Sequence, residues 1–261
     1  MSGTASSRLR NGACLLHNEA ELGSENRNRR SCAQFSFAVE ARCARAIVKV
    51  MTGPGESSSV MLLAREGMQR VPSDKIELFQ LRDFVPLDLR AGLIRLIEQD
   101  RRPSTLADAG DDRYFRTSET CDLDTTEPAV QALEDLLFDL NGIDPAHGEP
   151  LQGQRYDVGQ EFKPHCDYFN RGGADWATYC SVAGQRTWTF MIYLNEVEGG
   201  GATRFKAVGK TFQPEAGKLV CWNNRRPDLR ENPNTLHHGM KVRRGIKYVI
   251  TKWYREKPWG W

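Results

Sequence analysis

Several features that would place this chain in a common class are missing from its sequence. No apolar run approaches the roughly 20 residues that a transmembrane helix needs. The 36 Lys and Arg residues nearly balance the 34 Asp and Glu residues, and a formal charge of +2 provides no basic field for nucleic acid or a membrane surface. No basic start leads into an apolar segment, which argues against a secretory signal, whereas the Arg-rich and Ser-rich opening is compatible with organelle import. We therefore expect no nucleic-acid partner and no membrane association.

A disulfide framework is absent as well. The cysteines form no CxxC pair, and their number is odd; they stand at positions 14, 32, 43, 121, 166, 180 and 221. Such usage is typical of a reducing compartment rather than an oxidising one. We expect a cytoplasmic protein.

The first part of the chain differs in composition from the rest. Ser, Arg, Asn and Gly dominate residues 1–72, as in residues 23–30 and 53–59, and such segments bury too little apolar surface to offset the entropy lost on ordering. We predict a disordered or loosely structured N-terminal extension over residues 1–73, with a targeting or partner-binding segment as the alternative. The remaining residues, 74–261, are expected to form one catalytic domain around a single core.

Two helices and one strand are predicted in the first half of this domain. Alternating apolar residues predict a strand over residues 76–81, and helical spacing predicts a helix over residues 87–99. A loop is expected over residues 100–112. A second helix should begin at Pro128 and end at Gly142. Its buried stripe comprises Val130, Leu133, Leu136, Leu137 and Leu140.

The second half contains short strands separated by turn residues. We predict strands over residues 151–158, 162–167, 188–194, 202–205, 219–223 and 246–254. Helices followed by many short strands indicate an α+β domain whose strands form a double-stranded β-helix, or jelly roll, with the helices flanking one side.

A His-x-Asp motif marks the candidate metal site. Residues i and i+2 of an extended strand point to the same face, so His165 and Asp167 project together while Cys166 turns away. With a further imidazole from His237 or its neighbour His238, they would form a two-histidine, one-carboxylate triad that leaves coordination positions open on Fe(II). His-x-Asp pairs often arise by chance, so the interpretation depends on the joint pattern.

The last predicted strand supplies a candidate anchor for an acidic co-substrate. Lys247 and Trp253 share one face of it. Lysines are usually solvated, but a buried ammonium would suit the far carboxylate of 2-oxoglutarate. Thr203, after three glycines, could add a hydroxyl, and Tyr156 and Tyr193 could add phenol donors on neighbouring strands.

Several ordered stretches resemble prolyl 4-hydroxylases of the collagen type. They are residues 156–167 (YDVGQEFKPHCD), 184–187 (GQRT), 193–195 (YLN), 200–205 (GGATRF), 214–217 (PEAG), 237–247 (HHGMKVRRGIK) and 252–253 (KW). With a weaker match at residues 116–118, they cover about residues 114–256. The resemblance implies an Fe(II)- and 2-oxoglutarate-dependent dioxygenase that uses O2, forms succinate, and hydroxylates prolyl residues of a peptide or protein. It also implies L-ascorbate (vitamin C) as the reductant that restores ferrous iron.

The resemblance also assigns roles to individual residues. The implied iron ligands are His165, Asp167 and His237, because His237 precedes Lys247 by the family's ten-residue interval. Lys247 is implied to hold the C5 carboxylate of 2-oxoglutarate. The residues implied to lie near the co-substrate are Thr203 and Tyr156, and we expect Tyr193 there as a further phenol donor. Those implied to contact the peptide at the barrel mouth are Arg186 and Trp253.

The chain departs from this family at two positions near the site. Ala202 replaces an acidic residue, and Cys166 replaces a frequent aromatic one, which we expect to alter the mouth of the site rather than the iron. Without the peptide-substrate domain of the animal collagen enzymes, collagen is an unexpected substrate. The alternatives are the same chemistry on another side chain or a small molecule, a non-catalytic metal-binding barrel, and a zinc hydrolase. The oligomeric state has no signature in the sequence.

Overall fold

The computed structural model describes residues 57–104, 115–173 and 176–259, all within a compact unit that spans residues 51–261. Its helices and 3-10 turns are α2 (Ser58–Ala64), α3 (Leu87–Gln99), α4 (Pro128–Asn141), η1 (Pro145–His147), α5 (Trp176–Cys180), η2 (Lys206–Val208) and η3 (Pro233–Thr235). The strands of the first half are β1 (Gln69–Arg70), β2 (Leu78–Leu81), β3 (Arg102–Pro103), β4 (Glu119–Asp122), β5 (Gln152–Tyr156) and β6 (Phe162–His165). The later strands are β7 (Arg186–Tyr193), β8 (Gly199–Gly200), β9 (Thr203–Phe205), β10 (Lys210–Phe212), β11 (Leu219–Asn223), β12 (His237–Gly239), β13 (Val242–Arg244) and β14 (Lys247–Arg255).

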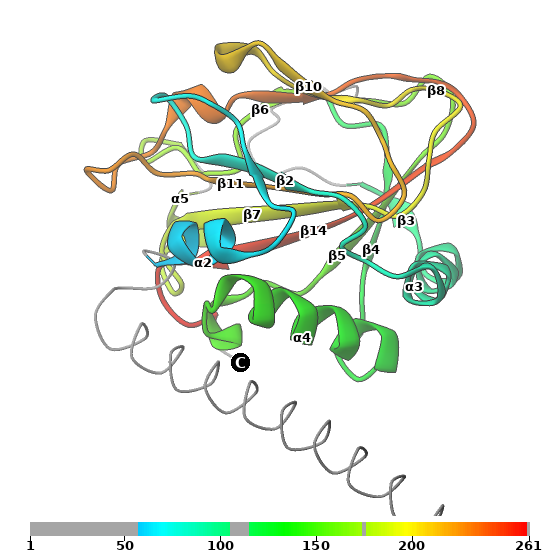
Figure 1. Ribbon diagram of the computed structural model, residues 1–261, viewed down its shortest axis with the longest axis horizontal. Coiled ribbons are helices and arrows are strands. Elements are labelled where there is room, and N and C mark those ends of the chain that lie inside the picture. The colour runs from blue at the N-terminus through cyan, green and yellow to red at the C-terminus, as the bar shows by residue number, and fades with distance from the viewer. Residues whose placement is uncertain (1–56, 105–114, 174–175, 260–261) are drawn as a thin grey trace, which may run out of the picture. The chain divides into compact units, whose positions relative to one another are not determined.

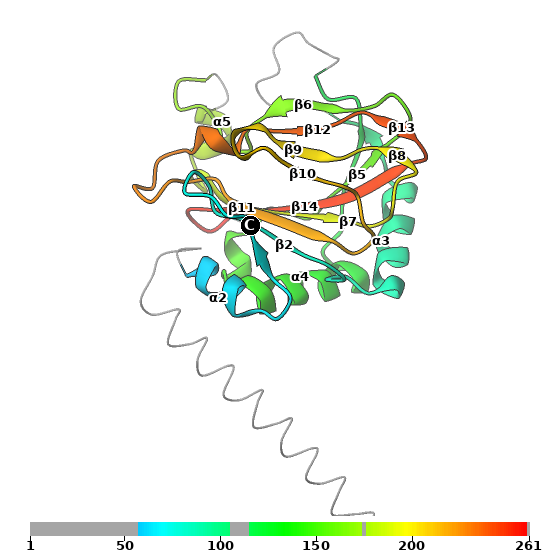
Figure 2. The same ribbon diagram turned by 45° about the horizontal axis from the view of Figure 1, so that its top comes forward.

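Two antiparallel sheets face each other in this unit. The larger has the order β1-β2-β11-β7-β14-β5-β4-β3, and the smaller has the order β10-β9-β12-β6. Figure 2 shows the smaller sheet above the larger one, with α2 and α4 beneath the larger sheet. Strands β8 and β13 form a separate two-stranded ribbon. The predicted α+β jelly roll is therefore confirmed.

Side-chain alternation along the central strands gives the larger sheet two buried faces. Trp188, Phe190 and Ile192 of β7 pack in the core between the larger sheet and the helices. Met191 and Tyr193 of the same strand pack in a second core between the two sheets. Residues two apart share a face of a strand, so one strand supplies both cores. The space between the sheets is where the candidate site lies.

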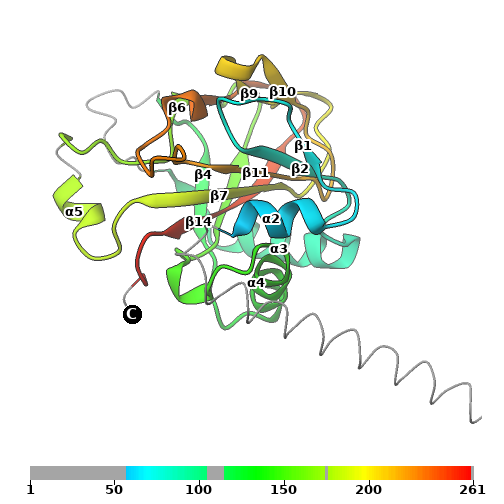
Figure 3. The ribbon, with the colours of Figure 1, turned by 60° about the vertical axis from the view of Figure 1, so that its left-hand side comes forward.

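The two predicted helices cover one face of the larger sheet. Helix α3 spans the predicted residues, and α4 begins with Pro128 and ends at Asn141. Gly142 caps α4 as predicted: its φ is 66°, and its N–H donates to the Phe138 carbonyl. Figures 1 and 3 show both helices on the same side of the sheet. The apolar stripe of α4 faces the sheet, with Leu136 only partly buried. The expectation that the helices brace one side of the sheet is confirmed.

The structure corrects the predicted start of the domain at residue 74. Helix α2 lies before that boundary and is part of the fold: Leu62 is fully buried, and the Ser58 hydroxyl donates to the Asn141 carbonyl at the end of α4. Strand β1 pairs with β2. The Ser-rich composition gave no signal for this short helix, because tertiary packing rather than helix propensity stabilises it. Residues 1–56 of the predicted extension lie outside the described residues.

Other elements were not predicted. The expected loop at residues 100–112 begins with β3, which pairs with β4, and its residues 105–112 lie outside the described part. Strands β4, β8, β10, β12 and β13 were missed because each is only two to four residues long. Among the described residues, no helix has the length and apolar character to cross a membrane.

Candidate active site

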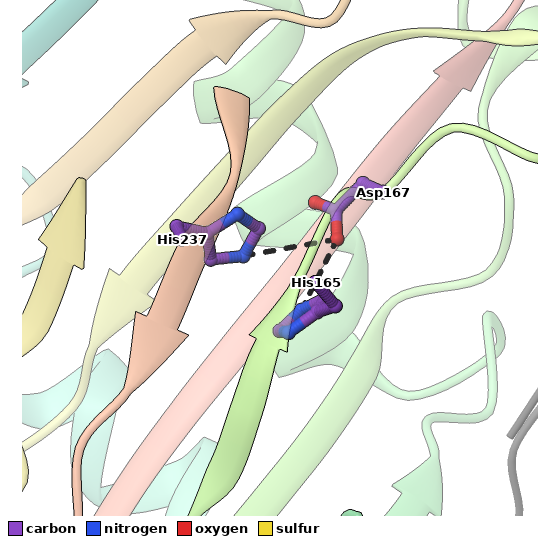
Figure 4. Close-up of side chains that lie close together, drawn as sticks. All are labelled: His165, Asp167 and His237. Atoms are coloured by element: carbon purple, nitrogen blue, oxygen red, sulfur yellow. Dashed lines mark ion pairs between the residues drawn. The ribbon is translucent and has the colours of Figure 1, made fainter. Parts of the chain in front are cut away.

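The three predicted metal ligands converge between the sheets. His165 ends β6 and lies opposite His237 of β12 in the antiparallel register, so the two imidazole rings are 4.2 Å apart between centroids. Asp167 follows β6 in a bend. Its Oδ1 lies 3.5 Å from Nε2 of His165 and 3.8 Å from Nε2 of His237. Dashed lines mark both pairs in Figure 4. All three potential ligand atoms lie within 4.8 Å of one another.

Hydrogen bonds orient both imidazole rings for metal binding. Nδ1 of His165 donates to the Lys163 carbonyl at 2.7 Å, and Nδ1 of His237 donates to the Thr235 carbonyl at 3.0 Å. A carbonyl oxygen only accepts, so each Nδ1 carries a proton and each Nε2 faces Asp167. Burial lowers the pKa of His237 to about 4, which keeps this ring neutral near pH 7. Two imidazoles and one carboxylate fit a divalent iron ion.

Two donors hold the other oxygen of Asp167. Oδ2 accepts from the Thr189 hydroxyl at 2.7 Å and from the Trp253 indole N–H at 3.0 Å, which directs Oδ1 toward the histidines. Burial raises the pKa of this carboxyl, but His237, His165 and Arg186 outweigh burial and hold the pKa well below its usual value. Asp167 is therefore an ionised ligand across the neutral range.

The Thr189 hydroxyl is itself fixed by buried Asn224. The Asn224 amide donates to Thr189 Oγ1 at 2.9 Å, so the threonine proton is directed to Asp167. The Trp222 indole donates to the Asn224 carbonyl oxygen at 3.0 Å and completes the chain of bonds. Outer partners of this kind orient a ligand and contribute to metal affinity.

Replacing Thr189 by valine should therefore weaken iron binding by about 10- to 100-fold, because the carboxylate of Asp167 loses a directing donor. Thr187→Val is the matched control: Thr187 is equally buried on the same strand, but its hydroxyl donates to the Tyr254 carbonyl away from the site. Fe(II) or Mn(II) titration of both variants measures the effect. Equal metal affinity in the two variants would contradict this role of Thr189.

His238 is separated from the metal ligands although it is their neighbour in sequence. Its Nε2 lies 2.9 Å from Oε2 of Glu161 on the opposite face of the smaller sheet. Alternation along β12 places His237 inward and His238 outward. The geometry thus favours His237 as the third ligand, in agreement with the resemblance.

Lys247 lies inside a small inner cavity that reaches the three ligands. This cavity, of about 40 Å³, is lined by residues that include Lys247, Thr203, Tyr156 and the ligands. The Lys247 side chain is 2% exposed, and its Nζ lies 4.8 Å from the Tyr156 ring centroid and 5.4 Å from that of Tyr193. No described carboxylate pairs with it. A buried ammonium without a counter-charge is costly, so this site fits a bound anion such as a dicarboxylate.

The predicted co-substrate residues differ in how closely they approach the cavity. Thr203 and Tyr156 line it, and Tyr156 lies directly opposite Lys247 in the β5–β14 register. Tyr193 is fully buried behind Thr203 and donates to the threonine hydroxyl at 2.7 Å. Gly201, with a φ of 71°, leaves room for the lysine stem, since a Cβ there would lie 3.3 Å from Lys247 Cδ.

Lys247→Met is expected to stabilise the metal-free and ligand-free protein by several degrees in Tm, most strongly at low pH. Burial lowers the pKa of Lys247 from its ordinary 10.5 to about 7. Below pH 7 the lysine is charged in both folded and unfolded states, and the full cost of burying the charge applies. Between pH 7 and 10.5 only the unfolded chain binds the proton, so the cost declines as the pH rises.

Thermal melts of the two proteins at about pH 6 and pH 9 provide the measurement. The difference in Tm should be larger at the lower pH. A difference that is constant with pH would contradict the buried, uncompensated ammonium.

Arg186 and Trp253 lie together in an outer pocket of about 540 Å³ that shares His165, Asp167 and Trp253 with the inner cavity. The Arg186 guanidinium stacks 4.0 Å from the Trp253 ring centroid and bonds both oxygens of Glu149, at 2.6 and 2.7 Å. A register shift between Tyr254 and Arg255 pairs Arg186 with Arg255. Arg186 therefore lies on the same face of the sheet as Trp253. Their predicted role in substrate contact stays a prediction.

Several residues that support the site were missed by sequence reasoning. Thr189 and Gln154 face the site from β7 and β5, and alternation from Met191 and Tyr156 could have identified them. Asn224 and Glu149 lie outside the strands, so no periodic pattern pointed to them. Their placement depends on the tertiary fold.

Facing sheets, a His-Asp-His triad and a buried lysine beside it form a jelly-roll site whose residues fit iron and a dicarboxylic keto acid. Comparison with known proteins agrees: residues 151–255 match the 2OG-Fe(II) oxygenase superfamily. This match covers the strands that carry the site, and the chain is also similar to prolyl 4-hydroxylases.

Two relatives and one solved structure describe this similarity. The chain is 33% identical over 145 residues to prolyl 4-hydroxylase subunit alpha-1 of Gallus gallus, covering 55% of this chain and 28% of that protein. It is 30% identical over 192 residues to the probable prolyl 4-hydroxylase 10 of Arabidopsis thaliana, covering 62% and 63%. The chain therefore spans less than two thirds of either relative. The viral collagen prolyl hydroxylase from Paramecium Bursaria Chlorella virus-1 shares the fold, with a TM-score of 0.54, 22% identity, and coverage of 68% of this chain and 95% of that one.

Proposed function

We propose that this protein is an Fe(II)- and 2-oxoglutarate-dependent dioxygenase that hydroxylates prolyl residues of a peptide or protein. The observation that carries the proposal is the uncompensated Lys247 ammonium in the same cavity as the His165, Asp167 and His237 ligand atoms. A zinc hydrolase would need the triad but would have no use for the lysine. The prolyl specificity is supported by the prolyl 4-hydroxylase homologues.

Residues that line the inner cavity would bind both the iron and the co-substrate. His165, Asp167 and His237 would hold the iron, and Lys247 would pair with the C5 carboxylate of 2-oxoglutarate, with Thr203 nearby to donate a hydrogen bond. The bound iron supplies the oxidative chemistry, in which 2-oxoglutarate and O2 become succinate and CO2 while a substrate C–H becomes C–OH. We further propose L-ascorbate as the reductant that restores ferrous iron.

The protein also orients the substrate and limits access by water. The outer pocket meets the inner cavity at Asp167 and Trp253, so a prolyl ring held there would approach the metal from one side. The Trp253 indole donates to Asp167 and therefore links the wall of the substrate pocket to a metal ligand. The narrow inner cavity leaves little room for solvent beside the keto acid.

Prolyl peptides incubated with the protein, Fe(II), 2-oxoglutarate and ascorbate are expected to gain the mass of one oxygen on proline. Tandem mass spectrometry locates the added oxygen, and succinate is quantified in the same reaction. Succinate formation without oxygen on any prolyl residue would contradict prolyl specificity. Oxygen on another side chain, or on a small molecule, would establish the alternative substrate class.

A further inference from the structure

The outer pocket contains more positive than negative groups among the described residues. The arginines that line it are Arg116, Arg186 and Arg255, whereas Glu149 is its only carboxylate apart from the metal ligand Asp167. Asp167 faces the two histidines, and its charge would be directed to the iron. The rest of the pocket wall is largely aromatic, including Phe162, Phe169 and Trp253.

A single carboxylate, that of Glu149, forms ion pairs with two of these arginines. Glu149 accepts both bonds from Arg186, at 2.6 and 2.7 Å, and its Oε1 lies 3.4 Å from Nη1 of Arg255. Arg255 also lines the pocket, but its side chain is fully buried. Glu149 therefore compensates at most one of the two charges that it contacts.

Arg116 is held by neutral partners alone. Its Nε donates to the Ser118 hydroxyl at 3.1 Å, and its Nη2 donates to Thr120 Oγ1 at 3.1 Å and Gln152 Oε1 at 3.0 Å. No described carboxylate forms an ion pair with it, although Tyr156 accepts a hydrogen bond from it and Asp167 attracts its charge. The side chain is 9% exposed and lies over the Phe162 ring, 5.0 Å from the centroid, at the edge of the pocket.

Arg116 thus lies beside the metal site but forms an ion pair with none of the described carboxylates. Phe162, under its guanidinium, also stacks on the imidazole of His165 at a centroid distance of 3.5 Å. Burial lowers the pKa of Arg116, and the interactions with Tyr156 and Asp167 offset this effect only in part. A buried cation that is hydrogen-bonded to neutral groups and has no carboxylate partner favours a ligand with an anionic acceptor.

We propose that Arg116 binds a carboxylate of the substrate, so that the enzyme prefers a prolyl residue next to an acidic group. The inference rests on the proposed function and specifies its substrate class. The carboxylate could belong to an Asp or Glu side chain adjacent to the proline or to a C-terminal proline itself. Both present the same planar acceptor to a guanidinium.

The experiment compares prolyl peptides that differ only in this charge. One pair has Asp or Asn next to the target proline, and a second pair ends in proline as a free acid or as a carboxamide. Hydroxylation is followed by mass spectrometry, and kcat/KM is obtained for each peptide. For at least one pair, the acidic member should be preferred roughly tenfold or more, the effect of one hydrogen bond to a charged group.

Two variants test the assignment to Arg116. Arg116→Gln should bring the acid-to-amide ratio of that pair close to one, whereas Arg95→Gln, which removes an exposed arginine on α3, should leave the ratio unchanged. Should Arg116→Gln fail to fold, the wild-type ratios still decide the substrate class. Arg116→Lys keeps the charge but loses the planar set of guanidinium donors, so it should show a reduced acid-to-amide ratio.

The outcomes separate this inference from the proposed function. Equal hydroxylation of acid and amide members in both pairs would overturn the acidic preference while leaving prolyl hydroxylation intact. An acidic preference that persists in Arg116→Gln would overturn the assignment to Arg116. Absence of succinate formation under every condition would instead contradict the proposed function.

Discussion

Replacing His237 by alanine is expected to abolish 2-oxoglutarate turnover, whereas replacing the adjacent His238 should leave most of it. His237 directs Nε2 toward Asp167 at 3.8 Å, but His238 is bonded to Glu161 on the other face of the strand. Loss of a direct ligand should exceed the roughly 10- to 100-fold effect of losing an outer partner. Succinate formation and Fe(II) affinity measure the difference.

The adjacent pair provides a sharp control because both variants remove one imidazole from β12. Circular dichroism and thermal melts of the two proteins check that each remains folded. Full succinate formation by His237→Ala, or an equal loss in both variants, would contradict the assignment of the third ligand.

Lys247→Ala should raise the KM for 2-oxoglutarate by roughly 30-fold or more, since truncating one partner of a buried charge pair costs about 2–5 kcal/mol. Among the described residues that line the inner cavity, Lys247 is the only lysine or arginine, and no described carboxylate pairs with it. The co-substrate should supply that partner. Steady-state succinate kinetics, with 2-oxoglutarate varied at saturating Fe(II), give the value.

A co-substrate without the far carboxylate provides the matched chemical control. Wild-type protein should use 2-oxoglutarate far better than 2-oxopentanoate, which has the same chain length and no C5 carboxylate. In Lys247→Ala the preference should largely disappear, because neither compound then finds a cation. Retention of the wild-type preference in the variant would place the carboxylate elsewhere.

Alternation in sequence was sufficient to predict much of the inner cavity. Lys247 and Trp253 share one face of β14 as expected, and both line the cavity together with Thr251 and Val249. Such predictions succeed where a strand is regular and long enough for its period to be read. The helices α3 and α4 were predicted well for the same reason, with Pro128 and Gly142 marking the ends of α4.

Features that depend on pairing between distant segments were not predictable in this way. Strand β12 is three residues long, and its place opposite β6 follows from the register between His237 and His165. Arg186 shares a face with Trp253 through a register shift that simple alternation does not contain. Thr189 and Asn224 form a bond that joins β7 to the segment after β11, and only the tertiary fold brings them together.

Oxygen uptake that depends on 2-oxoglutarate is the most direct test of the central claim. Purified protein is loaded with Fe(II) and given ascorbate and a panel of acidic and neutral prolyl peptides in an oxygen electrode, with succinate measured in parallel. The site described here predicts oxygen consumption that requires 2-oxoglutarate, matches succinate formation and disappears in His237→Ala. Binding of Fe(II) and 2-oxoglutarate without oxygen consumption for any peptide would instead indicate a non-catalytic metal-binding barrel.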